Sequence, residues 1–248
     1  MIKITDTVKH LIIINALFFL GTLVFKEKAY DLLAMHYFEN PAFKPWQIVT
    51  HIFMHANFTV YGKISITHIL FNMIALWMFG SSVEQMIGRK RFLILYFISG
   101  IGAVLFSQGI DYLHFHSLIS QFESSGMSLV DIHNIYKIPL PAGKGYTDAN
   151  FQSIYNIYNV QAVGASGAIN GIIVAFGVLL PRAKMGLMFL PIMIESRIFI
   201  PLLILSDVLF GVFSSNSNIG HFAHVGGAIF GFFVIWYYKN QFKNKYNR

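Results

Sequence analysis

Six long apolar segments alternate with polar or basic stretches along this 248-residue chain. They lie at about residues 8–25, 66–84, 92–110, 164–180, 198–213 and 220–238. Each is close to the length of about 20 residues that an α-helix needs to cross the hydrocarbon core of a bilayer. The pattern predicts an all-α membrane protein with six transmembrane helices, folded as one domain over residues 1–248.

Two connections between these segments are too long to be simple loops. Residues 26–64 contain many apolar side chains interrupted by polar ones, which favours an interfacial, partly re-entrant segment with Trp46 at the depth of the lipid headgroups. Residues 111–160 form an extended polar insertion, predicted to be external and far longer than the usual connection. Its sequence is compatible with a folded cap, a lid that faces the substrate, or a flexible insert.

The charges set the expected orientation and exclude several classes of partner and chemistry. Twelve of the 18 lysines and arginines lie at alternate ends of the apolar segments, which predicts that both termini are cytoplasmic. With 55% hydrophobic and 12% charged residues, the chain is too apolar for an ordinary soluble domain. The net charge of +7 does not gather into one patch with interleaved aromatic residues, so no nucleic-acid partner is expected. The absence of cysteine excludes disulfides, thiol nucleophiles and thiolate metal ligands.

Ser166 lies at the predicted start of the fourth apolar helix. The first backbone N–H groups of a helix have no intrahelical partner and carry the positive end of its dipole. A hydroxyl at this position therefore has anion-stabilising donors beside it, so that a nucleophile and part of an oxyanion hole could share one turn. The alternative is that the small residues around Ser166 only allow close helix packing.

Other polar groups occur on separate apolar segments. His68 and Asn72 are four residues apart and so lie on one face of the second helix, where they pair across helices or form part of a site. Asp207 is an intramembrane carboxylate, for which both a hydrogen bond to a neighbouring helix and a direct catalytic role are open. His221 and His224 begin the last helix.

Glycines are expected to bring the fourth and sixth helices together. Gly167 and Gly171 form one face of small residues four positions apart, and Gly227 and Gly231 form another. Gly164, at the head of the fourth segment, is counted with these packing glycines. Such faces let two backbones touch, which would allow Ser166 and His224 to come within reach of each other.

The three motifs, taken in order, resemble those of the rhomboid intramembrane serine proteases. They are His68-x-x-x-Asn72, Gly164-x-Ser166-Gly167 and Ala223-His224-x-x-Gly227-x-x-x-Gly231, each on its own predicted helix. The resemblance implies a six-helix rhomboid bundle that needs no cofactor and no metal. In it Ser166 is the nucleophile and His224 the general base, while Asn72, His68 and the Ser166 N–H bind the oxyanion.

The same resemblance implies a substrate and a place for the reaction. The substrate is another transmembrane protein, cut in or next to its transmembrane helix within the lipid bilayer. The active site faces the external side, and the expected location is the bacterial inner membrane. Gating is expected from the second and fifth helices and the loop at 214–220. The sequence predicts no oligomeric state.

Two positions depart from the family pattern. Asn170 stands where the family usually has an aromatic residue that packs against the catalytic imidazole. If Asn170 orients the ring by a hydrogen bond, activity survives, whereas a mobile ring would leave activity low. Trp46-Gln47 stands in place of the Trp-Arg pair seen in many members.

Three other classes of function compete with this interpretation. A rhomboid pseudoprotease would bind transmembrane clients without cutting them, but it usually lacks the serine or the histidine. A transporter or channel usually shows internal repeats, and none is convincing here. An intramembrane metalloenzyme could use histidines, but no His-Glu-x-x-His motif and no carboxylate at ligand spacing accompanies them in the sequence. Its candidate ligands would be His51, His55, His68, His221 and His224.

Overall fold

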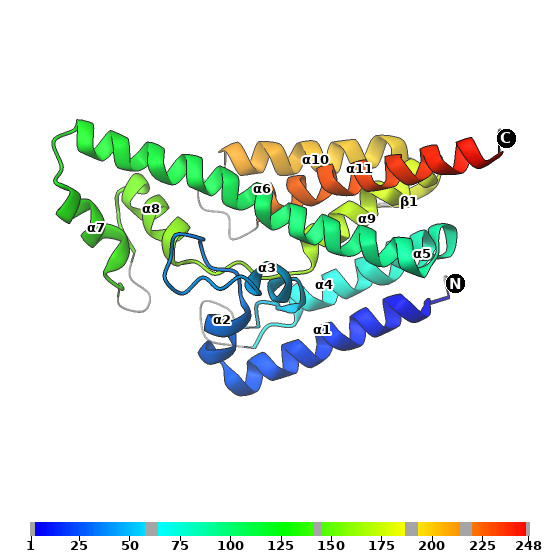
Figure 1. Cartoon of the computed structure of the whole chain (residues 1–248), viewed down its shortest axis with the longest axis horizontal. Helices are drawn as coiled ribbons and strands as arrows, with labels where there is room; N and C mark the ends of the chain where they lie inside the picture. Colours follow the sequence, from blue (N-terminus) through cyan, green and yellow to red (C-terminus); the bar gives the residue numbers. More distant parts are fainter. Residues whose placement is uncertain (1–2, 58–63, 141–144, 187–192, 214–219, 247–248) are drawn as a thin grey trace.

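The computed structural model describes residues 3–57, 64–140, 145–186, 193–213 and 220–246, with side chains as far as Gln241. Nearly all of the regular structure is helical (Figure 1). The helices are α1 (Asp6–Phe25), α2 (Glu27–Leu33), α3 (Gln47–Thr50), η1 (His51–Phe53), α4 (Thr67–Ala75), η2 (Leu76–Gly80), α5 (Ser81–Ile87), α6 (Arg89–Ser124), α7 (Leu129–Lys137), α8 (Ala149–Asn159), α9 (Ser166–Leu179), α10 (Ser196–Phe213) and α11 (His221–Tyr246).

Each of the six apolar segments is helical. The second segment is a continuous run of α4, η2 and α5, in which η2 is a wider π-type turn. Among the described residues, α1, α6 and α10 are long and apolar enough to cross a membrane by length and composition, and α9 is a shorter apolar helix. Helix α1 starts and α11 ends at the same end of the molecule, whereas α7 and α8 lie at the opposite end (Figure 1).

The third helix is much longer than predicted. Helix α6 has 36 residues and continues to Ser124, beyond the expected end near residue 110. At a rise of about 1.5 Å per residue it extends over about 54 Å, well beyond a hydrocarbon core of about 30 Å. The length of the apolar run does not reveal this extension, because the extension is apolar on only one side, where Phe115, Leu118 and Phe122 are buried.

The described parts of the 111–160 insertion are folded and have a hydrophobic core of their own. Helices α7 and α8 start at conventional N-caps, in which the side chains of Ser128 and Asp148 accept backbone N–H groups. Their apolar faces pack with the end of α6 into a second cluster, made of Tyr37, Phe115, Leu118, Phe122, Ile132, Ile135, Tyr136, Ile154 and Tyr158. Of the three possibilities left open by the sequence, this arrangement corresponds to a folded cap, with residues 141–144 outside the described part.

The 26–64 segment contains three short helical elements, α2, α3 and η1, and side-chain to backbone hydrogen bonds connect its parts. The indole N–H of the half-exposed Trp46 donates to the carbonyl of Leu32 at 2.8 Å. Gln47 is fully buried, and its amide donates to the carbonyls of Asp31 at 3.1 Å and Ala42 at 3.3 Å. The glutamine at the second position of the Trp-Gln pair therefore acts as an internal brace of this segment.

The fold is mostly helical, as predicted, with one short exception among the described residues. The 185–196 region contributes to an antiparallel hairpin, in which β1 (Lys184–Gly186) pairs with β2 (Met193–Glu195) and Met185 lies opposite Ile194. Residues 187–192 and the loop at 214–219, which was expected to take part in gating, lie outside the described residues.

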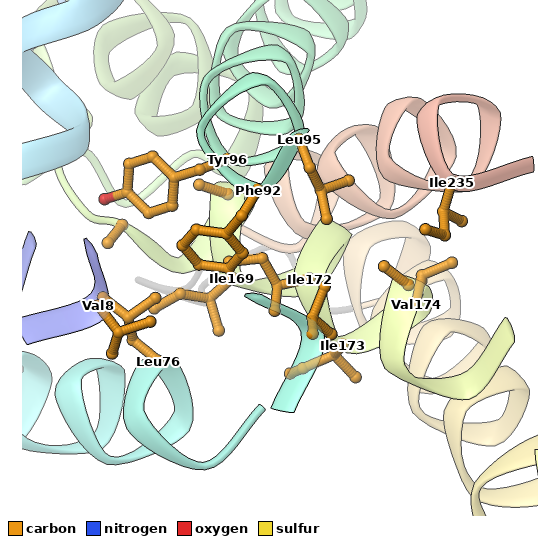
Figure 2. Close-up of a cluster of buried hydrophobic side chains, with 14 of the residues drawn as sticks. Val8, Leu76, Phe92, Leu95, Tyr96, Ile169, Ile172, Ile173, Val174 and Ile235 are labelled. Atoms are coloured by element: carbon orange, nitrogen blue, oxygen red, sulfur yellow. The ribbon is translucent and has the colours of Figure 1, made fainter. Parts of the chain in front are cut away.

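The main hydrophobic core lies where α9 meets the helices around it. Phe92, Leu95 and Tyr96 of α6 and Val8 of α1 belong to one cluster with Ile169, Ile172 and Ile173 of α9 (Figure 2). Nine consecutive residues of α9, 167–175, are buried. This short helix is therefore enclosed by protein, which fixes the position of its first residue, Ser166.

Helices α9 and α11 touch backbone to backbone through their glycines. A methyl group added to Gly227 would overlap the carbonyl oxygen of Gly167, and one added to Gly231 would overlap the Cα of Gly171. A methyl on Gly171 would lie 2.8 Å from the carbonyl oxygen of Gly227. Only hydrogen side chains fit at this crossing.

Replacing Gly227 with alanine is expected to lower the free energy of unfolding by about 1–3 kcal/mol, because the new methyl must push two backbones apart. The measurement is thermal unfolding in detergent micelles. Gly21→Ala is the matched control, since a methyl at this helical glycine meets nothing within 4 Å. An unchanged melting temperature for Gly227→Ala, equal to that of the control, would contradict the close crossing.

Candidate active site

Ser166 is the first residue of α9 and follows a sharp turn at Gly164. Gly164 precedes the helix rather than belonging to its packing face, and its φ of +135° is in a region that side chains rarely adopt. Its backbone N–H donates to the carbonyl of His51 at 3.0 Å, which ties the turn to the 26–64 segment. The turn directs the start of α9, with its unpaired N–H groups, toward the site.

His224 lies in the first turn of α11, beside Ser166. Its Nε2 is 3.0 Å from the hydroxyl oxygen of Ser166, a normal hydrogen-bond distance and within the reach that a nucleophile and a base would need. The glycine crossing begins one residue after Ser166 on α9 and three residues after His224 on α11, so the backbone contact sets this separation. The sequence predicted that the two side chains could approach, and the structure brings them together.

Asp207 of α10 also reaches this pair. One of its carboxylate oxygens lies 3.1 Å from Nδ1 of His224 and 2.7 Å from Nδ1 of His221, at hydrogen-bond distance from both. A carboxylate facing both Nδ1 atoms requires each of them to carry its hydrogen. His224 is thereby left with an unprotonated Nε2 that can accept the hydroxyl proton of Ser166.

His68 of α4 also lies near Ser166 and Gly164. Its Nδ1 accepts the backbone N–H of Ala56 at 3.2 Å, so the hydrogen of a neutral ring is on Nε2. A methyl on Gly164 would lie 3.1 Å from Nε2 of His68 and 3.5 Å from the hydroxyl oxygen of Ser166. A side chain at residue 164 would therefore crowd His68 and contact Ser166, which glycine avoids, and Nε2–H of His68 is a candidate donor to an oxyanion formed at Ser166.

Asn72 and Asn170 both donate to their own helices. The amide of Asn72 bonds to the carbonyl of His68 at 2.9 Å, which leaves its second N–H available. The amide of Asn170 bonds to the carbonyl of Ser166 at 3.0 Å, and both ring nitrogens of His224 are engaged by other groups. The imidazole is therefore held by Asp207 and not by a hydrogen bond from Asn170.

The five histidines considered as metal ligands do not converge on one site. His55 pairs with His68, with ring centroids 5.0 Å apart, while Nδ1 of His51 donates to the carbonyl of Gln47 at 2.8 Å. Burial lowers the pKa of His51 to about 4, so this ring is neutral at pH 7.

One carboxylate does lie at ligand distance in space, contrary to the expectation from sequence spacing. Among the described residues, Asp207, His221 and His224 form a group whose candidate ligand atoms lie within 4.8 Å of one another. The two nitrogen–oxygen distances of 2.7 and 3.1 Å are shorter than the separation of about 3.3 Å between ligands of tetrahedral zinc. The arrangement in the structure is that of a hydrogen-bonded group.

Comparisons with known proteins all point to the same protein family. The family model described as Rhomboid domain matches residues 42–241. The presenilin-associated rhomboid-like protein A, mitochondrial, of Danio rerio is 26% identical over 71% of this chain and 34% of its own length. RHOMBOID-like protein 12, mitochondrial, of Arabidopsis thaliana is 29% identical over 75% of this chain and 52% of its own length. Rhomboid protease AarA of Providencia stuartii is 29% identical over 75% of this chain and 53% of its own length. The chain thus spans a third to about half of these relatives.

Proposed function

Because the chain belongs to the rhomboid family, we propose that it is an intramembrane serine endopeptidase acting through Ser166 and His224. It hydrolyses peptide bonds in or next to transmembrane helices of other membrane proteins. The observation that carries the proposal is the 3.0 Å distance between Nε2 of His224 and the hydroxyl of Ser166, at the start of a buried helix.

The geometry supports a two-step reaction through an acyl-enzyme. Nε2 of His224 takes the proton of Ser166 as the oxygen attacks the peptide carbonyl, and then delivers it to the departing amine. Water attacks the resulting ester by the same route. The oxyanion formed in each step is bound by Nε2–H of His68, the amide of Asn72 and the backbone N–H of Ser166.

The substrate must unwind before it can react. A peptide bond inside a transmembrane helix is hydrogen-bonded within its own helix and shielded by side chains. Local unwinding would bring such a bond to Ser166. Segments that form weak helices are therefore the substrates that we propose.

The proposed topology has six transmembrane helices, with both termini in the cytoplasm and the site toward the external side. It is supported by the alternating basic residues and by the position of α1's start and α11's end at one end of the molecule (Figure 1). The prediction of a bacterial inner membrane finds no support in the comparisons, because the relatives include proteins whose names place them in mitochondria. The proposal is therefore limited to an integral membrane protein.

The test is covalent trapping combined with cleavage. The purified protein is reconstituted in liposomes with a reporter transmembrane segment, and a fluorophosphonate is used as the serine-directed probe. We expect site-specific cleavage by mass spectrometry, a phosphonate adduct on the peptide that contains Ser166, and no effect of a chelator. Reporter binding without cleavage and without adduct would favour the pseudoprotease, whereas loss of cleavage on chelation would favour the metalloenzyme.

Replacing Asn170 with alanine is expected to lower turnover by only about 2- to 10-fold, the effect of losing one neutral hydrogen bond. The bond that is lost runs to the carbonyl of Ser166, while His224 keeps its contact with Asp207. Cleavage of the reporter measures the effect. A loss as large as that caused by removing His224 would mean that Asn170 orients the imidazole after all.

A further inference from the structure

We propose that Asp207 is a positioning residue for the dyad, whose carboxylate holds the His224 imidazole with its free Nε2 toward Ser166. The inference rests on the proposed function and adds a third member to the two-residue apparatus that the sequence motifs imply. It follows from a continuous chain of contacts between three helices: α10 supplies the carboxylate, α11 the imidazole and α9 the hydroxyl.

The first argument concerns the tautomer of His224. A neutral imidazole has one N–H, and only the form with that hydrogen on Nδ1 can accept a proton from Ser166 at Nε2. In the structure Nδ1 of His224 faces the Asp207 oxygen at 3.1 Å, and Nε2 faces the Ser166 hydroxyl at 3.0 Å. An acceptor at Nδ1 therefore selects the reactive tautomer.

The second argument concerns charge. When the Ser166 proton moves to Nε2, the ring becomes an imidazolium with Nδ1–H pointing at the carboxylate. Asp207 is 9% exposed, and in such a low-dielectric position an anion beside this cation stabilises it more than water would. The proton ends on Nε2 and later on the leaving amine, while Asp207 remains an acceptor throughout.

The third argument concerns the rigidity of the carboxylate. The same Asp207 oxygen accepts Nδ1–H of His221 at 2.7 Å, and the His221 ring stacks on Phe210 with centroids 5.7 Å apart. An isolated ionised carboxylate is costly inside an apolar helix, and two N–H donors offset part of that cost. His221 thus fixes Asp207, which in turn holds His224.

A purely structural alternative exists, in which Asp207 only fastens α11 to α10 through its shorter bond to His221. The two possibilities differ in what Asp207→Asn changes. Asparagine keeps the shape and an acceptor oxygen but loses the charge. A fastening role would reduce stability, whereas a positioning role reduces the rate of the chemical step in protein that is still folded.

The experiment compares reporter cleavage by wild type, Asp207→Asn, His221→Gln and Ser206→Ala in liposomes, with kcat and KM measured separately and melting temperatures recorded. We expect Asp207→Asn to lower kcat by about 10- to 100-fold with KM within about threefold of wild type, as for loss of a charge-assisted hydrogen bond. His221→Gln, which keeps an N–H donor for Asp207, is expected to retain kcat within about fivefold. Ser206→Ala is the matched control on α10, because within the described part of the chain its hydroxyl bonds to the carbonyl of Leu203 in its own helix.

An Asp207→Asn enzyme with wild-type kcat would overturn the inference while leaving the proposed function intact, and an inactive wild type would overturn the proposed function itself. Should Asp207→Asn not fold, the wild-type protein provides the answer through ¹⁵N-histidine NMR in micelles. We expect the ring of His224 to show a hydrogen on Nδ1. A ring with its hydrogen on Nε2 would contradict the role given to Asp207.

Discussion

Replacing Ser166 with alanine is expected to abolish cleavage, lowering turnover by at least about 1,000-fold, because water must then attack the peptide carbonyl without a covalent intermediate. Removing the base with His224→Ala should lower turnover by about the same factor. The double variant should be no worse than either single one, since nucleophile and base act as one unit. Initial rates of reporter cleavage in liposomes give all three values.

The matched control for this series is Ser107→Ala, a serine-to-alanine change on another apolar helix. The Ser107 hydroxyl bonds to the carbonyl of Val104, one turn earlier in α6, and takes no part in the site. Its activity should equal that of wild type. Additive losses in the double variant would show that Ser166 and His224 contribute independently, and residual cleavage by Ser166→Ala at the wild-type rate would exclude Ser166 as the nucleophile.

Replacing Asn72 with alanine is expected to lower kcat by about 100- to 1,000-fold, the usual effect of removing one oxyanion donor. Asn72 is 7% exposed, and one of its two amide hydrogens is already bonded to the carbonyl of His68. No bond of the other hydrogen is seen among the described residues, so it could bind charge that appears only during the reaction. KM should therefore change much less than kcat.

Asn15 provides a control of the same residue type for the Asn72 series. Its amide donates to the carbonyl of Leu11, four residues earlier in α1, and the side chain is fully buried. Asn15→Ala reproduces the loss of a buried helix-internal bond away from the dyad, so its kcat per folded molecule should stay at the wild-type level. Equal kcat losses in Asn15→Ala and Asn72→Ala would assign the effect to folding and not to the oxyanion.

Much of the site was accessible from the sequence because it depends on backbone rules. A serine opening an apolar helix, and glycines four residues apart on two helices, predict the approach of Ser166 to His224 without any knowledge of side-chain rotamers. The ends of α6 and the β1–β2 hairpin were less accessible, because they depend on packing against partners that are distant in sequence. The cap core, for example, combines Tyr37 with residues from α6, α7 and α8.

The order of α10 and α11 along the chain is a sequence signal for the contact between Asp207 and His224. Helices α10 and α11 are consecutive and antiparallel, with α10 ending at Phe213 and α11 starting at His221. Residues at similar distances from a turn between such helices lie at similar depth. Asp207 lies six residues before the end of α10 and His224 three residues after the start of α11, so both lie within two turns of the connection. Which faces of the helices meet is decided by packing, and sequence spacing alone does not give it.

The glycine crossing of α9 and α11 has an entropic consequence. An interface built from side chains can exchange rotamers and slide, whereas hydrogen side chains have no torsions to change. The alignment of Ser166 with His224 is therefore achieved when the helices fold, and no conformational freedom remains to be lost there when a substrate arrives. In the proposed reaction, the binding energy of the substrate would then be left for the task that does require it, the unwinding of the substrate's own helix.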